Sequence, residues 1–359
     1  MKQKITLLLA GVVTVACLYW VFKPVNMTAL WNSILAVNPL WAMLSIAIFY
    51  FSMYLRALRW GWLFKPNYEI PGNHLFRPLM ICFAFNSILP GRVGEFVRAF
   101  YVGKKEGTGF PAAMATVVSE RIFDGVTLLS FLAFALYRLP PIPPGLRVEV
   151  GNYSVNGAQI QPLINKIVIM CVVLVAGVIA LMIPAIERLL VKILQKLPLV
   201  PKEISAKLVE ILQGVVKGFE SVRSPKNLAV IVVYSFVIWI LVAIANMVLA
   251  WGMAGVSSMN LLQSMAVMTL IGVFIMIPAA PGYWGLYEAG TIFALKVLDV
   301  QGAANPATAY ALVLHLSQFV PIVGIGLIYA AQSQVKITKI DKGDPADDHE
   351  RMAKPNEEE

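Results

Sequence analysis

The sequence predicts an all-α polytopic membrane protein with about six full spans and two broken, re-entrant helical hairpins arranged as an inverted repeat. Three observations predict this class. The 359 residues are 58% hydrophobic and only 14% charged, with a mean hydropathy of +0.73, whereas a soluble domain carries about 25% charged residues. Runs of about 20 apolar residues recur, and each is long enough to cross the hydrocarbon core. Two further apolar segments are interrupted by the same P-G-x-x-G pattern.

The two interrupted segments carry most of the functional information. Asn86 to Glu95 reads N-S-I-L-P-G-R-V-G-E, and Pro278 to Glu288 reads P-A-A-P-G-Y-W-G-L-Y-E. The halves of a broken segment are too short to span alone, and non-helical backbone at that depth is tolerated only inside protein or beside a water-filled cavity. Re-entrant hairpins satisfy this condition, with kinked full spans as the alternative. Broken segments at corresponding positions of two halves point to a transporter binding site.

The elements are expected in the following order. Full spans are expected at 5–22, 40–58, 111–137, 163–183, 228–251 and 307–331, and broken segments at 74–102 and 261–297. The first run is treated as an uncleaved span, because Lys2 and Lys4 precede it and no small-x-small cleavage site follows. A weak β-hairpin signal surrounds Gly151 and Asn152, where short alternating segments flank turn residues.

The segments outside the spans are polar or amphipathic. Apolar residues recur at helical spacing between 200 and 222, which predicts an amphipathic cytoplasmic helix. Residues 332–359 are acidic and lack apolar periodicity, so we expect a disordered cytoplasmic tail. Residues 1–331 then form a single membrane domain, with a first half at about 40–137 and a second at about 228–331.

Loop charges predict the orientation. Loops 56–78, 103–110 and 184–227 are rich in Lys and Arg, whereas 23–38, 252–260 and 298–306 are nearly empty of them. The positive-inside rule places the first set, and with six spans both termini, in the cytoplasm of a cell (inner or plasma) membrane protein. The first hairpin then enters from the cytoplasm and the second from the outside. The unit span–hairpin–span therefore occurs twice with opposite orientation.

Charged residues inside the spans are expected to have partners. Glu120, Arg121 and Asp124 lie in the 111–137 span, and each costs at least about 2.5–3.5 kcal/mol at the bilayer centre. We expect them to face the protein interior, near the arginines and glutamate that follow the first P-G turn. Arg56 and Arg59 end the 40–58 span, and they are either an interface anchor or a lipid-phosphate contact.

The chemistry of the broken segments suits an anion. Helix N-termini after the two P-G turns present N–H groups and positive dipole ends that favour phosphate. Arginines can add charge-assisted hydrogen bonds, and the acids can balance them or carry protons for coupling. The alternative is a set of structural ion pairs that hold the hairpins. The candidate substrate-binding residues are Asn86, Pro90, Gly91, Arg92, Gly94, Glu95, Arg98, Glu120, Arg121, Asp124, Pro281, Gly282, Gly285 and Glu288.

Several other chemistries lack a signal. The cysteines Cys17, Cys82 and Cys171 show neither metal-ligand nor disulfide spacing. His74 and His315 have no obvious catalytic companions, so no catalytic constellation, metal or cofactor is expected. The net charge of +9 is concentrated in the loops, where it sets topology and meets anionic lipid rather than nucleic acid.

The motifs together resemble a known family. The sequences at 86–99, 119–124 and 277–288 resemble the lysylphosphatidylglycerol synthase transmembrane (flippase-like) family, and the likeness extends over about residues 5–331. This resemblance implies movement of lipid between leaflets. It argues against lipid aminoacylation, because that activity belongs to a separate soluble domain in multi-domain members, and the segment after Ala331 is too short for one.

The expected function is therefore that of a flippase or translocase for an anionic-headgroup lipid: a phospholipid, an aminoacyl-phospholipid or a polyprenyl-phosphate-linked lipid. The alternatives are a secondary transporter of a small soluble anion and a membrane enzyme of lipid or glycolipid modification. A lateral opening to the bilayer would favour lipid, and a sealed central cavity would favour a soluble anion. Membrane lipid is the expected partner, with no nucleic acid, while homo-oligomerisation and proton or ion coupling are left open.

Overall fold

A computed structural model describes residues 15–19, 21–23, 25–65, 67–138, 147–150, 153–181, 192, 224–275, 281–298, 300 and 304–333. The expected amphipathic helix, the expected tail except its first two residues, and much of the first span lie outside this part. The long elements are α2 (Met27–Leu35), α3 (Pro39–Phe64), α4 (Phe76–Ile88), α5 (Val93–Lys105), α6 (Phe110–Arg138), α7 (Gly157–Leu181), α10 (Pro225–Trp251), α11 (Leu261–Phe274), α12 (Leu286–Val297) and α13 (Ala304–Gln332). Short 3-10 turns include η1 (Gly72–Leu75), η2 (Pro90–Arg92) and η4 (Pro281–Tyr283).

The described part is helical, as expected, apart from one short β-hairpin. Strand β1 (Arg147–Val150) pairs antiparallel with β2 (Tyr153–Asn156). This hairpin lies at the place where the weak turn signal predicted one. Three helices among the described residues are long and apolar enough to cross a membrane, namely α3, α10 and the 306–332 part of α13. The count of six spans stays a prediction, although α6 and α7 have 29 and 25 residues.

The long helices α3 and α10 form the centre of the bundle and run antiparallel. Near one end, the backbone N–H of Asn38 donates to the carbonyl of Gly252 at 2.9 Å. Further along, the hydroxyl of Ser45 donates to the carbonyl of Ala245 at 2.7 Å. Toward the other end, Arg59 of α3 donates to the hydroxyl of Ser235 on α10. From the first contact to the last, the residue numbers therefore rise along α3 and fall along α10. Opposed numbering at successive contacts is what an antiparallel pair requires.

Helices α4 and α5 pack against each other as a short hairpin whose tip is η2. Each has 13 residues, or about 20 Å of helix, which is shorter than a hydrocarbon core of about 30 Å. Gly94, at the start of α5, makes the close approach possible, because a Cβ there would lie 2.0 Å from the carbonyl oxygen of Cys82. The beginning of α5 therefore lies against the end of α4, and the two helices run antiparallel.

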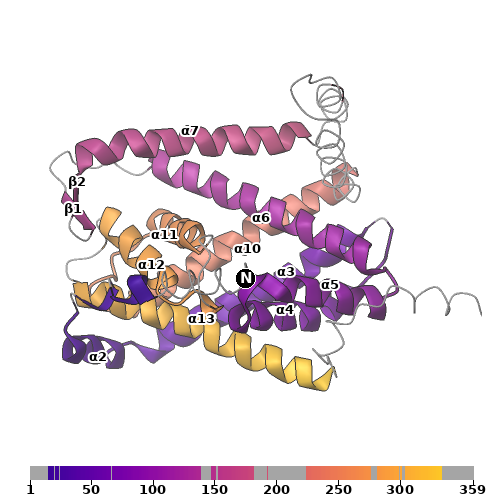
Figure 1. Ribbon diagram of the computed structural model, residues 1–359, viewed down its shortest axis with the longest axis horizontal. Helices are drawn as coiled ribbons and strands as arrows, with labels where there is room; N and C mark the ends of the chain where they lie inside the picture. Colours follow the sequence, from indigo (N-terminus) through magenta and orange to yellow (C-terminus); the bar gives the residue numbers. More distant parts are fainter. Residues whose placement is uncertain are drawn as a thin grey trace, which may run out of the picture.

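Helices α11 and α12 form a second short hairpin, with 14 and 12 residues. Gly290, early in α12, lies against the end of α11, because its Cβ would contact Phe274 at 3.0 Å and the Cα of Ile271 at 3.3 Å. In Figure 1 the two hairpins lie at opposite sides of the view, with α4 and α5 on the right and α11 and α12 on the left.

The two hairpins join opposite ends of the α3–α10 pair. At the end of α3, the hydroxyl of Tyr68 donates to the carbonyl of Thr108 at 3.3 Å, so both ends of the first hairpin lie together there. At the end of α10, a Cβ on Gly255 would lie 2.7 Å from Pro306, so both ends of the second hairpin lie together at the other end. Each hairpin thus begins and ends at the same end of the α3–α10 pair.

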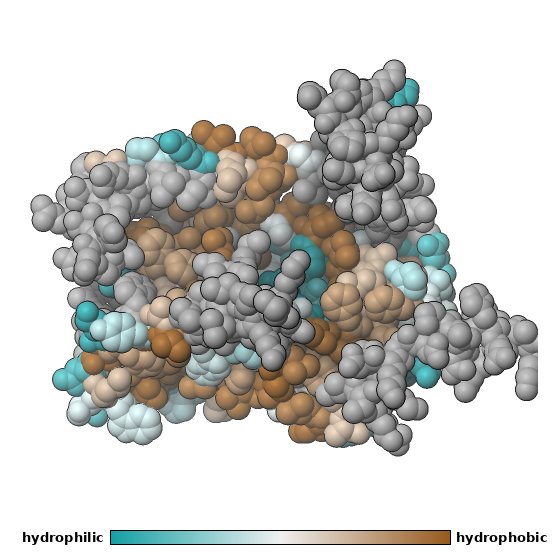
Figure 2. Space-filling view, in the orientation of Figure 1, coloured by the Kyte–Doolittle hydropathy of each residue, from teal (hydrophilic) through white to brown (hydrophobic). Residues whose placement is uncertain are grey.

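The packing of the two hairpins is reciprocal. Helix α4 of the first hairpin packs on α13, and α11 of the second hairpin packs on α6. The contact of α4 with α13 is close, because a Cβ on Gly326 would lie 2.5 Å from the carbonyl oxygen of Met80. The second turn, η4, also packs on α4. Apolar side chains cover much of the described surface in Figure 2, as expected for a protein surrounded by lipid.

Candidate functional site

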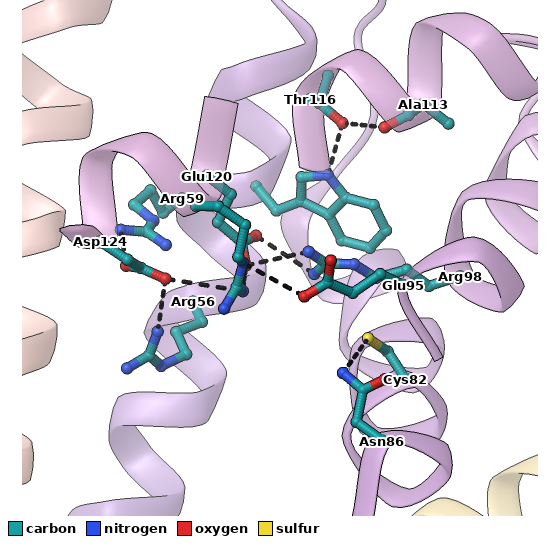
Figure 3. A network of polar contacts seen from close by, with 12 residues as sticks. Arg56, Arg59, Cys82, Asn86, Glu95, Arg98, Ala113, Thr116, Glu120 and Asp124 are labelled. Atoms are coloured by element: carbon teal, nitrogen blue, oxygen red, sulfur yellow. Dashed lines mark hydrogen bonds and ion pairs between the residues drawn. The ribbon is translucent and has the colours of Figure 1, made fainter. Parts of the chain in front are cut away.

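The candidate site is a cluster of buried charged side chains where α3, α5, α6 and α10 meet (Figure 3). Two of its arginines come from α3, which continues to Phe64 instead of ending near residue 58. Arg56 and Arg59 are therefore inside the bundle, with only 3% and 0% of their surfaces exposed. The interpretation that they anchor the end of the span at the interface is wrong, because both arginines are buried and paired within a longer helix; the alternative, a lipid-phosphate contact, stays a prediction.

Asp124 of α6 is the partner of both α3 arginines. It accepts hydrogen bonds from Nη1 of Arg59 at 2.8 Å and from Nη1 of Arg56 at 3.3 Å. The indole N–H of Trp239 on α10 donates to the same carboxylate at 3.0 Å. The guanidinium of Arg56 also lies over the Trp239 ring, 4.3 Å from its centre. This carboxylate therefore accepts three hydrogen bonds, two of them charge-assisted.

A second pair connects α5 with α6. Arg98 and Glu120 are both completely buried, and two nitrogens of the guanidinium donate to the two carboxylate oxygens at 3.1 and 3.3 Å. This is the two-point geometry that arginine offers and lysine lacks. The Arg98 guanidinium also lies 4.7 Å from the ring centre of Trp60, whose indole donates to Thr116 at 2.8 Å. The prediction that Glu120 faces the interior near Arg98 is confirmed.

Arg121 and Glu95 form the rim of the cluster. Arg121 pairs with Glu120, lies 3.7 Å from Glu95 and lies 3.6 Å from Asp124. Its side chain is 33% exposed and that of Glu95 is 14% exposed, whereas the inner members are almost fully buried. Figure 2 shows a teal, polar patch in the middle of the brown surface.

The rim opens onto an apolar surface. Phe96 follows Glu95 on α5 and is 50% exposed, and Val118, one helical turn before Arg121 on α6, is 38% exposed. A Cβ added to Gly125, one turn after Arg121, would meet no atom within 4 Å. The partly exposed rim of the charged cluster therefore has exposed apolar side chains beside it on α5 and α6.

The cluster carries more hydrogen-bond donors than acceptors. Four arginines face three carboxylates, so the formal charge is +1 when all are ionised. The Nε atoms of Arg56, Arg59, Arg98 and Arg121, together with Nη2 of Arg59, have no hydrogen-bond acceptor within the described part of the chain. An unpaired buried donor costs about 1–3 kcal/mol. An anion with several oxygens would offer the acceptors that this cluster lacks.

The two P-G turns have the same backbone conformation. Gly91 and Gly282 have φ angles of 78° and 77°, and the residues after them, Arg92 and Tyr283, have φ angles of 56° and 58°. Two consecutive left-handed residues are rare, and only glycine adopts that region without strain. In each copy, a glutamate is the third residue of the following helix, Glu95 in α5 and Glu288 in α12.

The second turn leads to a separate polar pair. Glu288 of α12 is fully buried, and one of its oxygens lies 2.6 Å from Nδ1 of His315 on α13. Its other oxygen accepts the backbone N–H of Gly285 at 2.7 Å. This carboxylate occupies the start of α12, where the helix dipole favours negative charge. The N-terminal position that seemed suited to a phosphate is thus already used by the chain's own glutamate.

The candidate residues therefore fall into three groups. The charged cluster unites Glu95, Arg98, Glu120, Arg121 and Asp124. Gly94 of α5 packs against α4 beside Asn86, whose amide contacts the Cys82 sulfur at 3.8 Å. Glu288 and Gly285 lie in the second pair. Pro90, Gly91, Pro281 and Gly282 shape the two turns, and Arg92 is exposed on η2 outside the ion pairs described above. Whether any of them binds substrate stays a prediction.

Sequence reasoning missed Trp239 and His315 as members of these groups, and it left Arg56 and Arg59 between an interface anchor and a lipid-phosphate contact. The signal for the two arginines was the carboxylates of α6, which needed cationic partners, but their position at the end of an apolar run suggested an interface. Among the described residues, no three His, Cys, Asp or Glu side chains are placed to hold a metal ion.

Comparison with known proteins identifies a matching family and a similar membrane protein. The family described as the lysylphosphatidylglycerol synthase TM region matches residues 7–326. Over 146 residues, the chain is 25% identical to a UPF0104 membrane protein of Methanothermobacter thermautotrophicus. That alignment covers 38% of this chain and 42% of the relative, so it spans less than half of either protein.

Proposed function

Because the chain belongs to the lysylphosphatidylglycerol synthase TM region family of membrane proteins, we propose that it moves an anionic-headgroup lipid between the two leaflets of the membrane. The substrate class comprises phospholipids, aminoacyl-phospholipids and polyprenyl-phosphate-linked lipids, which share a phosphate group. The single observation that carries this proposal is the arginine-rich cluster, with its unpaired buried N–H groups and its formal charge of +1. Phosphate oxygens are the natural acceptors for arginine.

The lateral position of the rim supports a lipid rather than a soluble anion. Arg121 is the most exposed arginine of the cluster, and it lies on the same face of α6 as the exposed Val118 and the open space at Gly125. A lipid headgroup could reach Arg121 while its acyl chains stay against apolar side chains. A soluble ion would have to cross that apolar surface, where charge is expensive.

An inverted repeat supports movement between two leaflets. We propose that the α3-to-α6 unit and the α10-to-α13 unit are equivalent halves of opposite orientation, with both hairpins re-entrant. The antiparallel α3–α10 pair, the identical P-G turns and the reciprocal packing of α4 on α13 and α11 on α6 support this relation. Repeats of opposite orientation allow a binding site to face either side by rocking of one unit against the other.

The test is lipid movement in proteoliposomes that contain fluorescent phosphatidylglycerol. The Arg121→Gln variant removes the charge at the rim but leaves the buried Arg98–Glu120 pair intact, so it should fold and lose most of the protein-dependent movement. Arg121→Lys should retain part of it, because the charge stays and the two-point geometry is lost. Arg77→Gln is the matched control, since Arg77 is exposed and contacts Tyr329 rather than the cluster.

Two further arms distinguish the alternatives. Gly125→Leu should slow lipid movement by filling the open space beside the rim, while Gly125→Ala should not. Uptake of inorganic phosphate by the same vesicles would instead support a small-anion transporter. Movement of phosphatidylglycerol at the full rate in Arg121→Gln would overturn the assignment of the cluster as the headgroup site.

A further inference from the structure

Each half contains a buried acid–base pair between the second helix of its hairpin and the long helix that follows, but the chemistry is reversed. In the first half, Arg98 of α5, the second helix of the hairpin, pairs with Glu120 of the long helix α6. In the second half, α12, the second helix of the hairpin, provides Glu288, and the long helix α13 provides His315. Glu120 is nine residues after the proline that starts α6, and His315 is nine residues after Pro306 near the start of α13. The first pair has a permanent cation, whereas histidine gains or loses its charge near neutral pH.

The surroundings of His315 suit an imidazolium ion. Glu288 accepts from its Nδ1 side at 2.6 Å, and the carboxylate is fixed on its other side by the N–H of Gly285. Tyr287 stacks on the imidazole ring with centres 4.3 Å apart and planes 13° apart, and Trp284 lies 4.5 Å away. The faces of aromatic rings carry negative charge and attract cations. An adjacent carboxylate and two aromatic rings therefore contact the imidazole.

The other titratable groups near the pair belong to three elements. On α12, Tyr287 donates its hydroxyl to Gln318 of α13 at 3.2 Å. On α13, Tyr310 lies near Tyr287 and donates to the carbonyl of Asn246 at 2.9 Å. In the helical residues that precede α2, Cys17 lies close enough to Glu288 to interact with its charge. Neither tyrosine nor the cysteine carries charge at neutral pH in its ordinary state, so within this set only Glu288 and His315 can form an ion pair.

The pair lies at the base of the second P-G turn. A Cβ on Gly282 would lie 2.9 Å from the indole nitrogen of Trp284 and 3.0 Å from Phe319, and both of these rings contact His315. The turn itself packs on α4 of the first hairpin. A change in the charge of His315 therefore acts close to the place where the tip of the second hairpin packs on the first hairpin.

We infer that Glu288 and His315 form a proton-binding site that holds the second hairpin against α13. With the proton bound, an ion pair joins α12 to α13 across 2.6 Å. Without it, a neutral imidazole can still donate its Nδ1–H to the carboxylate, but the attachment of the hairpin weakens because the Coulomb attraction between two opposite charges is lost. The site binds a proton whether or not lipid is the cargo; only the step in which this proton drives lipid movement rests on the function proposed above.

The first experiment observes the proton directly. The chain has three histidines, His74, His315 and His349, so the intact protein with ¹⁵N-labelled histidine in lipid nanodiscs gives few ring signals. The His315 signal is identified by its absence in His315→Gln. In the wild type we expect this signal to change between its neutral and protonated forms as the pH is varied. In Glu288→Gln, proton binding should be weaker by about tenfold or more, which corresponds to a shift of the titration midpoint by about one pH unit. His74→Gln is the control and should leave the His315 titration unchanged.

The outcomes separate this inference from the proposed function. A His315 ring that keeps one form between about pH 5 and 8, or a titration unaffected by Glu288→Gln, would overturn the proton site even if lipid moves. A titrating ring in a protein that moves no lipid would support the site and defeat the proposed function alone. If both hold, phosphatidylglycerol movement should depend on pH in the wild type, and this dependence should be lost in His315→Gln. Unchanged pH dependence in that variant would overturn proton coupling.

Discussion

Replacing Asp124 by asparagine is the sharpest test of how the charged cluster is held together. The carboxylate is the acid partner of Arg59 at 2.8 Å and of Arg56 at 3.3 Å. Asparagine keeps the size and can keep the hydrogen bond from Trp239, but it removes the negative charge. Two arginines that are 0% and 3% exposed would then be buried without a counter-ion in direct contact.

The magnitude follows from the number of partners on each side. Breaking a buried ion pair by removing one partner costs about 3–5 kcal/mol, because the remaining charge is left uncompensated. Asp124→Asn should lie at the upper end of this range, since it leaves two arginines. Arg59→Gln should cost less, about 1.5–3 kcal/mol for a hydrogen bond to a charged group, because Asp124 keeps Arg56 and lies 3.6 Å from Arg121. The structure therefore predicts an asymmetry within one ion pair.

The assay is reversible unfolding of the purified protein by SDS in mixed micelles, followed by circular dichroism. Asp124→Asn should reduce the free energy of unfolding more than Arg59→Gln does. The double variant should be no less stable than Asp124→Asn alone, because it removes one of the arginines that the first change leaves unpaired. Ser235→Ala is a control that removes only one hydrogen bond to Arg59. A greater loss in Arg59→Gln than in Asp124→Asn would refute this account.

Two other predictions address the hairpins. Gly94→Ala should lower the thermal midpoint, because its Cβ would lie 2.0 Å from a backbone oxygen of α4 and such overpacking costs about 1–3 kcal/mol or more of stability. Gly125→Ala should leave the midpoint unchanged, because there is open space around that position. An unchanged midpoint in both variants would contradict the close packing of α4 and α5. Cysteines at the exposed Lys104 and Ser257 should react with a membrane-impermeant maleimide from opposite sides, and labelling of both from one side would disprove the inverted repeat.

The two hairpins could be predicted from the sequence because the signal is local. A proline followed by glycines inside an apolar run ends a helix whatever surrounds it, and the two copies reveal themselves by comparison. Even so, the register of the copies is not uniform. The second has two additional residues, Trp284 and Gly285, between the left-handed residue and its helix. Only the structure shows that Glu95 and Glu288 nevertheless take the same third position of the helix.

The composition of the charged cluster could not be predicted, because it depends on contacts between distant segments. Asp124 and Arg59 are 65 residues apart, and Glu288 and His315 are 27 apart. A basic residue near the end of an apolar run looks the same whether it anchors the helix at the interface or continues inside a longer helix. The role of the two α3 arginines depends on α6. There Asp124 has no cationic partner on its own helix other than Arg121, and the α3 arginines supply the others.

Energetics favour a ligand-binding role for the cluster over a purely structural one. Seven ionisable groups at about 2.5–3.5 kcal/mol each amount to roughly 20 kcal/mol of insertion cost before any pairing. Pairing offsets much of this, yet well-packed apolar residues often serve stability as well as a buried ion pair does. A structural network should also satisfy its own donors, whereas five arginine nitrogen atoms here have no acceptor among the described residues. Within the arginine–carboxylate cluster these unpaired atoms are all donors, although the unpaired Oδ1 of the nearby Asn86 is an acceptor. An anionic headgroup would supply the acceptors that the arginines lack.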